Sequence, residues 1–177
     1  IKSTVEILKS LGVKVEYLSD PLSPEASEGQ RRKIKLKAEN INLETMDYEK
    51  FSKSRISVLF VGPLLTRFNS FKFPPPGGDK IGLRPISVQL KALRKLGARI
   101  EREDGYYSVE RDELLGKEII LEEFSPTATE SVMMAAVLAK GKTIIKGAAS
   151  ELSVQDLGNM LIKMGANIKG LGTHTIE

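Results

Sequence analysis

The sequence has no cysteine and only one histidine, His174, among its 177 residues. The lack of cysteine excludes a disulfide framework, a thiolate nucleophile and a cysteine zinc site. A metal site built on imidazole needs more than one histidine. His174 also lies in a Gly-Thr-His-Thr stretch, which predicts a solvated turn rather than a catalytic position.

Aromatic residues and long apolar runs are also scarce. Aromatics make up 6% of the chain and do not alternate with a basic patch, which argues against single-stranded nucleic acid as a partner, because such proteins stack bases on aromatic side chains. No apolar run approaches the roughly 18 to 20 residues that span a bilayer, and no signal peptide is recognisable. We therefore expect a soluble cytoplasmic protein with no membrane partner.

Charge of both signs is abundant. The chain has 27 basic and 23 acidic residues, a net charge of +4, which suits a small anionic ligand better than it demands nucleic acid. The longest basic run, residues 31–37, alternates with apolar Ile34 and Leu36, which predicts a strand with one solvated face. The preceding segment, residues 19–30, is rich in proline, serine and glutamate and predicts an inserted loop.

Three segments share one pattern: residues 8–15, 93–100 and 161–168. Each pattern predicts an amphipathic helix that ends at a glycine with positive φ, followed by a strand. These glycines are 85 and 68 residues apart, which suits units of several strands and two helices better than a solenoid of short repeats.

Two further helices are predicted between the repeats. One runs from about Tyr48 through Phe60, is entered at Asn42 or Thr45 and is interrupted near Pro63. The other covers residues 127–139 and is closed by a glycine before a strand at residues 143–146.

Alternating helices and strands predict an α/β or α+β domain. We place its repeat units at about residues 1–45, 46–115 and 116–177 and expect the first to lack its first strand, because the chain opens inside a predicted helix.

Residues 74–79 combine three prolines, two glycines and an aspartate. That composition predicts an exposed loop where backbone approaches a ligand, and the flanking Arg55, Arg67 and Arg84 carry guanidinium groups that match phosphate or carboxylate oxygens. On the residues alone, a surface turn with scattered arginines explains the stretch equally well.

Four motifs in order carry a family resemblance: Gly-Pro-Leu-Leu-x-Arg-Phe at residues 62–68, Pro-Gly-Gly-x-x-Ile-Gly-x-Arg-Pro at 76–85, Ala-Thr-Glu at 128–130 and Gly-x-Gly-Thr-x-Thr-Ile at 170–176. With them the chain resembles the UDP-N-acetylglucosamine enolpyruvyl transferases, of the EPSP synthase-like type. The resemblance implies an inside-out α/β barrel, in which each of two domains has three βαβαββ units. The chain would be most of one domain, with the second domain of the same polypeptide as its partner.

The resemblance also implies site residues. Asp79 would be the catalytic general acid, at a position usually filled by cysteine, and Arg55 would face the substrate cleft. The uridine nucleotide would be held by two further groups: Arg84, Pro85, Ile86, Ser87 and Val88, and Glu123, Phe124, Ser125 and Pro126. The implied reaction transfers enolpyruvate from phosphoenolpyruvate to the 3-hydroxyl of UDP-N-acetylglucosamine and releases phosphate, with no metal or other cofactor. It is the first committed step of peptidoglycan synthesis, and hence of cell-wall biogenesis.

Three positions depart from the family pattern. Ser87 stands where aspartate is usual, Glu123 where lysine is common, and Pro126-Thr127 where Val-Gly is common. A carboxylate beside a diphosphate repels it. We therefore keep open a divergent paralogue that binds a nucleotide sugar or other anion without turnover, and a third hypothesis, nucleic-acid binding, which the scarce aromatics disfavour.

Overall fold

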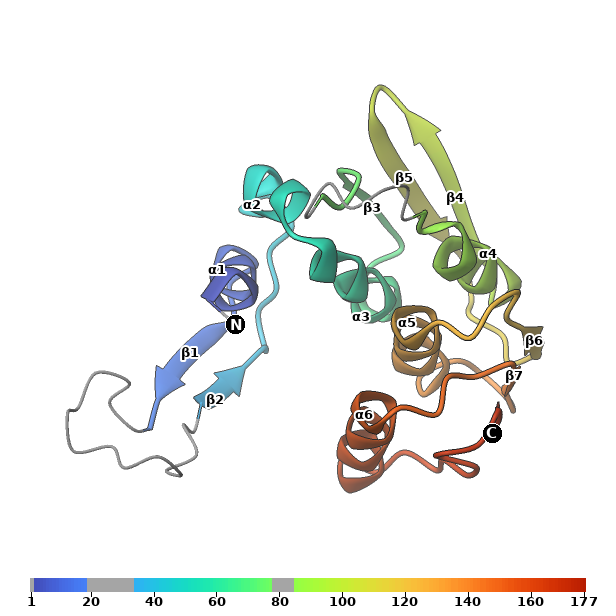
Figure 1. Ribbon diagram of the computed structural model, residues 1–177. Helices are drawn as coiled ribbons and strands as arrows, with labels where there is room; N and C mark the ends of the chain where they lie inside the picture. The colour runs from blue at the N-terminus through green and yellow to red at the C-terminus, as the bar shows by residue number, and fades with distance from the viewer. Residues whose placement is uncertain (1, 19–33, 78–84) are drawn as a thin grey trace.

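The computed structural model describes residues 2–18, 34–77 and 85–177 (Figure 1). Predictions that fall on residues 19–33 and 78–84, including the loop at 19–30, Asp79 and Arg84, lie outside them. In chain order the elements are α1 (Lys2–Ser10), β1 (Lys14–Tyr17), β2 (Ile34–Lys37), α2 (Tyr48–Lys53), the 3₁₀ helix η1 (Arg55–Phe60), α3 (Val61–Arg67), β3 (Ser70–Phe73), α4 (Ser87–Lys95), β4 (Ala98–Glu103), β5 (Tyr106–Arg111), β6 (Glu118–Ile120), α5 (Pro126–Ala136), β7 (Ile144–Lys146), α6 (Leu152–Lys163) and β8 (Thr175–Ile176).

The described strands form three small sheets. β1 and β2 are an antiparallel pair, and β3, β5 and β4 form an antiparallel sheet in that order. The third sheet has the order β6-β7-β8, with β6 parallel to β7 and β8 antiparallel to β7. Two parallel strands joined by helix α5 are the α/β element of the fold, and the antiparallel pairs give it its α+β character.

Helices occupy the interior and sheets the outside. In Figure 1, α3 and α5 lie side by side near the middle, with the sheets around the periphery. The β3-β5-β4 sheet turns Phe71, Phe73 and Val109 inward, whereas Lys72 and Glu110 of the same strands are exposed. Side chains alternate across a strand, so one face of this sheet packs on helices and the other meets solvent. The predicted α/β architecture with outward sheets is confirmed.

Helix α5 is the central helix. Seven of its 11 residues are buried, and they lie on all sides of the helix rather than along one stripe. A helix that is apolar or small on every side is stable only when other elements surround it. Gly62 of α3 lies directly against the backbone of Ser131 of α5.

The helix ends of the three repeated segments are confirmed. Gly12, Gly97 and Gly165 have φ values of +86°, +117° and +105°, and each follows the last turn of α1, α4 or α6. A side chain there would be strained, which explains why the same residue type recurs. The third segment differs after its glycine: no strand is assigned to residues 166–168, although the backbones of Lys169 and Glu177 pair with each other.

The helix predicted from about Tyr48 to Phe60 does begin at Tyr48, but its predicted capping residue and its extent are wrong. Asp47, not Asn42 or Thr45, caps α2, because its carboxylate accepts the amide of Lys50. That hydrogen bond lowers the pKa of Asp47. Ser54 then adopts an extended conformation, so the helical backbone is interrupted between α2 and η1. Pro63 interrupts nothing, because it lies in the first turn of α3, where a missing N–H costs no helical bond.

Two other expectations are corrected in part. The helix predicted at 127–139 is α5, which ends at Ala136, and Gly141 follows a turn with φ of +91°. In the described part of the basic strand, Leu36 is 53% exposed, so β2 has no buried apolar face. A two-stranded hairpin has too few neighbours to cover one. No described helix is long and apolar enough to cross a membrane.

Candidate functional site

Two helix N-termini lie together at one end of the molecule. Helix α4 begins at Ser87 and helix α5 at Pro126, and the two helices pack against each other. Inside the contact, the side-chain amide of Gln89 donates a hydrogen bond of 2.8 Å to the hydroxyl of Thr127. The structure thus brings together the two segments, 85–88 and 123–126, that the sequence predicted to hold a nucleotide.

Arg55 contacts the first of these segments. It is the first residue of η1, and its Nη2 donates to the carbonyl oxygen of Pro85 at 3.1 Å. A guanidinium stays protonated across the physiological pH range. Arg55 therefore brings a fixed positive charge to the start of α4.

The second segment ends in a well-formed cap. Ser125 is the N-cap of α5, and its hydroxyl accepts the amide of Ala128 at 3.3 Å, with Pro126 at the first helical position. Phe124 before it is 64% exposed. Its ring lies 4.5 Å from that of His174, whose Nδ1 is 2.9 Å from the carbonyl oxygen of Ala148. Helix N-termini carry partial positive charge, so this end of the fold suits an anion.

The side chains of the predicted binding residues differ in their exposure to solvent. Pro85, Ser87 and Glu123 are exposed, whereas Ile86 and Val88 are only 6% and 7% exposed and belong to the core. Ile86 and Val88 can meet a ligand only through their backbone groups. Glu122, not Glu123, pairs with a lysine here, because its carboxylate lies 2.8 Å from the ammonium group of Lys91 in α4. The charge of Glu122 is thus partly neutralised, whereas Glu123 is exposed to solvent.

The start of the proline-glycine loop has a structural reason for its glycine. A Cβ on Gly77 would overlap the carbonyl oxygen of Ser52 in α2. The backbone at Gly77 therefore approaches the protein's own helix, not a ligand as the composition had suggested. Arg67 does not point to this loop either, because its Nη1 donates to the carbonyl oxygen of Ala38 at 2.8 Å.

Comparison with known proteins places this geometry in a family. A family model described as EPSP synthase (3-phosphoshikimate 1-carboxyvinyltransferase) matches residues 1–177. The chain belongs to the EPSP synthase family. It is 38% identical over 176 residues to a UDP-N-acetylglucosamine 1-carboxyvinyltransferase of Hydrogenovibrio crunogenus, covering 99% of this chain and 40% of that protein. A protein of the same name from Treponema denticola is 46% identical over 150 residues, covering 84% of this chain and 35% of that protein.

Solved structures of the EPSP synthase family share the fold. The enolpyruvyl transferase NikO from Streptomyces tendae superposes with a TM-score of 0.76 at 16% identity, over 99% of this chain and 39% of that one. EPSP synthase from Acinetobacter baumannii gives 0.63 at 19% identity, over 99% and 38%. The chain thus spans about 40% of the length of the relatives that it matches. The inside-out α/β barrel expected from the resemblance is confirmed as its fold.

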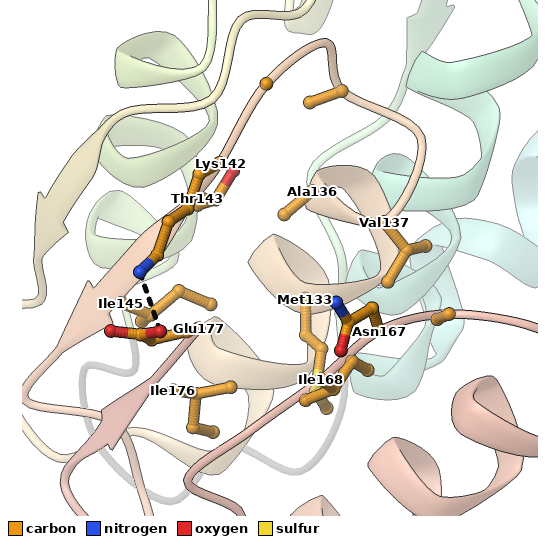
Figure 2. A pocket seen from close by; sticks show the side chains of 13 residues that line it. Met133, Ala136, Val137, Lys142, Thr143, Ile145, Asn167, Ile168, Ile176 and Glu177 are labelled. Atoms are coloured by element: carbon orange, nitrogen blue, oxygen red, sulfur yellow. Dashed lines mark ion pairs between the residues drawn. The ribbon is translucent and has the colours of Figure 1, made fainter.

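A pocket of about 400 Å³ lies away from these helix N-termini (Figure 2). It is bounded by the last turns of α5, by residues 141–145 leading into β7, and by residues 166–168. Ile176 and Glu177 at the end of β8 also line it, and Ile176 pairs with Ile145 of β7. None of the predicted site residues is among the residues that line this pocket.

Glu130 is a buried carboxylate behind the site. It is 8% exposed, and Oε1 accepts the hydroxyl of Ser153 at 3.0 Å. Burial raises its pKa above the ordinary value of 4.5, the nearby charge of Glu151 adds to this, and the Ser153 hydrogen bond opposes it. The carboxylate joins the first half of α5 to the first turn of α6.

We predict a pH dependence from Glu130. Because its pKa is higher in the folded state, the unfolded chain ionises first, and stability is lost as pH rises from 4.5 through the raised pKa. Glu130→Gln should remove this loss. As pH rises from 4.5 through the raised pKa of Glu130, the free energy of unfolding of the variant should therefore increase relative to that of the parent. Denaturant unfolding at stepped pH measures it, with the exposed Glu101→Gln as control; parallel curves for parent and Glu130→Gln would contradict the prediction.

Sequence reasoning missed two residues of this region. His174 is an exposed turn residue, as predicted, but its contact with Phe124 spans 50 positions of sequence and has no local signal. Gln89 was missed because it lies among buried positions of an amphipathic helix, where an apolar residue is expected. A polar residue at such a position is itself a signal, since buried amides are hydrogen-bonded.

Proposed function

We propose that this chain is the nucleotide-sugar-binding part of a UDP-N-acetylglucosamine 1-carboxyvinyltransferase. The complete protein would move the enolpyruvyl group of phosphoenolpyruvate to the sugar 3-hydroxyl and release phosphate. The observation that carries the proposal is the meeting of the N-termini of α4 and α5, with Arg55 hydrogen-bonded to Pro85 just before α4. The names and 38–46% identities of the relatives support the substrate pair.

Different residues of the site would contact different parts of the nucleotide. The N-terminus of α5, capped by Ser125, and the guanidinium of Arg55 would attract the diphosphate of the nucleotide. Backbone groups at Ile86 and Val88 would contact the uridine, because those side chains are buried. Exposed Phe124 offers an apolar surface beside the same end.

The chemical step would need residues beyond these. Asp79 and Arg84 belong to the motif at residues 76–85. In this proposal Asp79 donates the proton that the methylene carbon of phosphoenolpyruvate gains, while the sugar hydroxyl loses its proton to a base of the second domain and its oxygen adds to the neighbouring carbon. The new methyl group then loses a proton to a base as the C–O bond to phosphate breaks, which restores the double bond and releases phosphate. The second domain, phosphoenolpyruvate, the role in peptidoglycan synthesis and the cytoplasmic location are parts of the same proposal.

Phosphate release tests the proposed function. The complete protein should release phosphate only when UDP-N-acetylglucosamine and phosphoenolpyruvate are both present. Asp79→Ala and Arg84→Ala should each lower the rate at least about tenfold, since a positioned proton donor or a charge-assisted contact contributes that much or more. Arg99→Ala is the matched arginine control, because Arg99 is exposed on the outer sheet face and pairs with Asp112.

The divergent paralogue makes a different prediction. It is favoured by one observation, the exposed carboxylate of Glu123 beside the anion-binding end. Such a protein would bind UDP-N-acetylglucosamine in a calorimeter but release no phosphate. Release that needs both substrates would exclude it.

A further inference from the structure

We propose that the hydrogen bond from Gln89 to Thr127 sets the spacing of the two nucleotide-binding segments, which makes Gln89 a positioning residue for the nucleotide sugar. This inference rests on the proposed function. Neither residue is among the predicted contacts, but Gln89 follows directly on segment 85–88 and Thr127 on segment 123–126.

The bond is partly buried, with Gln89 as its buried partner. Gln89 is 2% exposed, and its Nε2 lies 2.8 Å from Thr127 Oγ1. The same hydroxyl lies 3.4 Å from the hydroxyl of Ser125, which in turn accepts the amide of Ala128. A continuous chain of polar contacts therefore runs from the first turn of α4 to the N-cap of α5.

The cost of breaking this hydrogen bond constrains how α4 and α5 are placed along each other. An amide left unpaired in the core costs about 1–3 kcal/mol, so α4 and α5 are held at the offset that keeps the bond. Apolar contacts between the same helices are tolerant of small slides by comparison, because dispersion is non-directional. One buried hydrogen bond thus fixes the offset that packing alone would leave loose.

The separation of the two segments affects the affinity for a ligand that contacts both of them. A nucleotide diphosphate that contacts residues 85–88 at one end and the α5 N-terminus at the other is sensitive to their separation, because misplaced donors lose affinity. Phosphoenolpyruvate is a smaller anion and is not bound by both segments in this proposal. Loss of the link should therefore act on one substrate and spare the other.

The test uses the complete protein with Gln89→Leu, Thr127→Val and the double variant. Each single change should raise the KM and the calorimetric Kd for UDP-N-acetylglucosamine about tenfold, the equivalent of one such bond. The KM for phosphoenolpyruvate should stay within about twofold. The double variant should be no worse than the poorer single variant, because both remove one interaction. Thr127→Ser keeps the hydroxyl and should restore affinity.

A second pair serves as control. Lys91 and Glu122 bridge α4 and the same segment, but both are more than half exposed. Surface pairs contribute little, so the double variant Lys91→Met, Glu122→Gln should bind the nucleotide sugar within about twofold of the parent. Thermal unfolding of every variant is measured alongside.

The outcomes are separable. If the parent protein does not bind UDP-N-acetylglucosamine, the proposed function fails and the inference with it. If the parent binds and turns over, three results would each overturn the positioning role alone: unchanged affinity in the Gln89 and Thr127 variants, equal losses for both substrates, or additive losses in the double variant.

Discussion

Phe73→Ala is expected to lower the free energy of unfolding by about 3–5 kcal/mol, the usual cost of deleting a fully buried aromatic ring. Phe73 of β3 has no exposed surface. Its ring centroid lies 5.1 Å from that of Tyr107 in β5 and 6.0 Å from that of Phe51 in α2. The ring therefore joins the second sheet to the helix that precedes Arg55, and its removal loosens the support of that arginine.

Two comparison variants test this expectation by thermal and denaturant unfolding. Phe73→Leu keeps much of the volume and should cost clearly less than Phe73→Ala. Phe124→Ala removes the same side chain from a 64% exposed position and should change stability by less than about 0.5 kcal/mol. Equal costs for Phe73→Ala and Phe124→Ala would show that the aromatic cluster does not support the fold as described.

Gly62→Ala is expected to cost about 2–4 kcal/mol, because overpacking against rigid backbone cannot relax. Gly62 is buried in α3 at its crossing with α5, and a Cβ there would overlap the carbonyl oxygen and carbonyl carbon of Ser131. One helix would have to move from the other. Since α5 packs against α4 as well, the displacement would reach the helix ends that form the candidate site.

The matched control is Gly158→Ala. Gly158 is also a buried helix glycine, in α6, but the nearest atoms that a Cβ there would meet are Cδ2, Cδ1 and Cγ of the Leu171 side chain, not backbone. That side chain can rotate, and alanine favours a helix over glycine by about 1 kcal/mol. Gly158→Ala should therefore be close to neutral. A neutral Gly62→Ala would mean that the helices separate at little cost.

Part of the candidate site could be predicted from local patterns. The family resemblance pointed to residues 84–88 and 123–126 as a ligand site, which stays a prediction. The described parts of both segments run into the first turn of a helix, and helix ends are easily read from sequence. Their meeting could not be read, because it depends on a hydrogen bond between positions 38 apart. The burial of Ile86 and Val88 was equally hidden, since it follows from how α4 packs.

The sequence by itself determined the helix-glycine ends of the three repeated segments, the position of most helices and the family. These depend on residues a few positions apart: a glycine with positive φ ends a helix whatever lies beyond it. Tertiary structure alone decided which faces are buried, why Gly62 and Gly77 must lack a side chain, and how Arg55, α4 and α5 meet. Those features arise from contacts between distant segments, whose free energies exceed local preferences and leave no periodic signal in the chain.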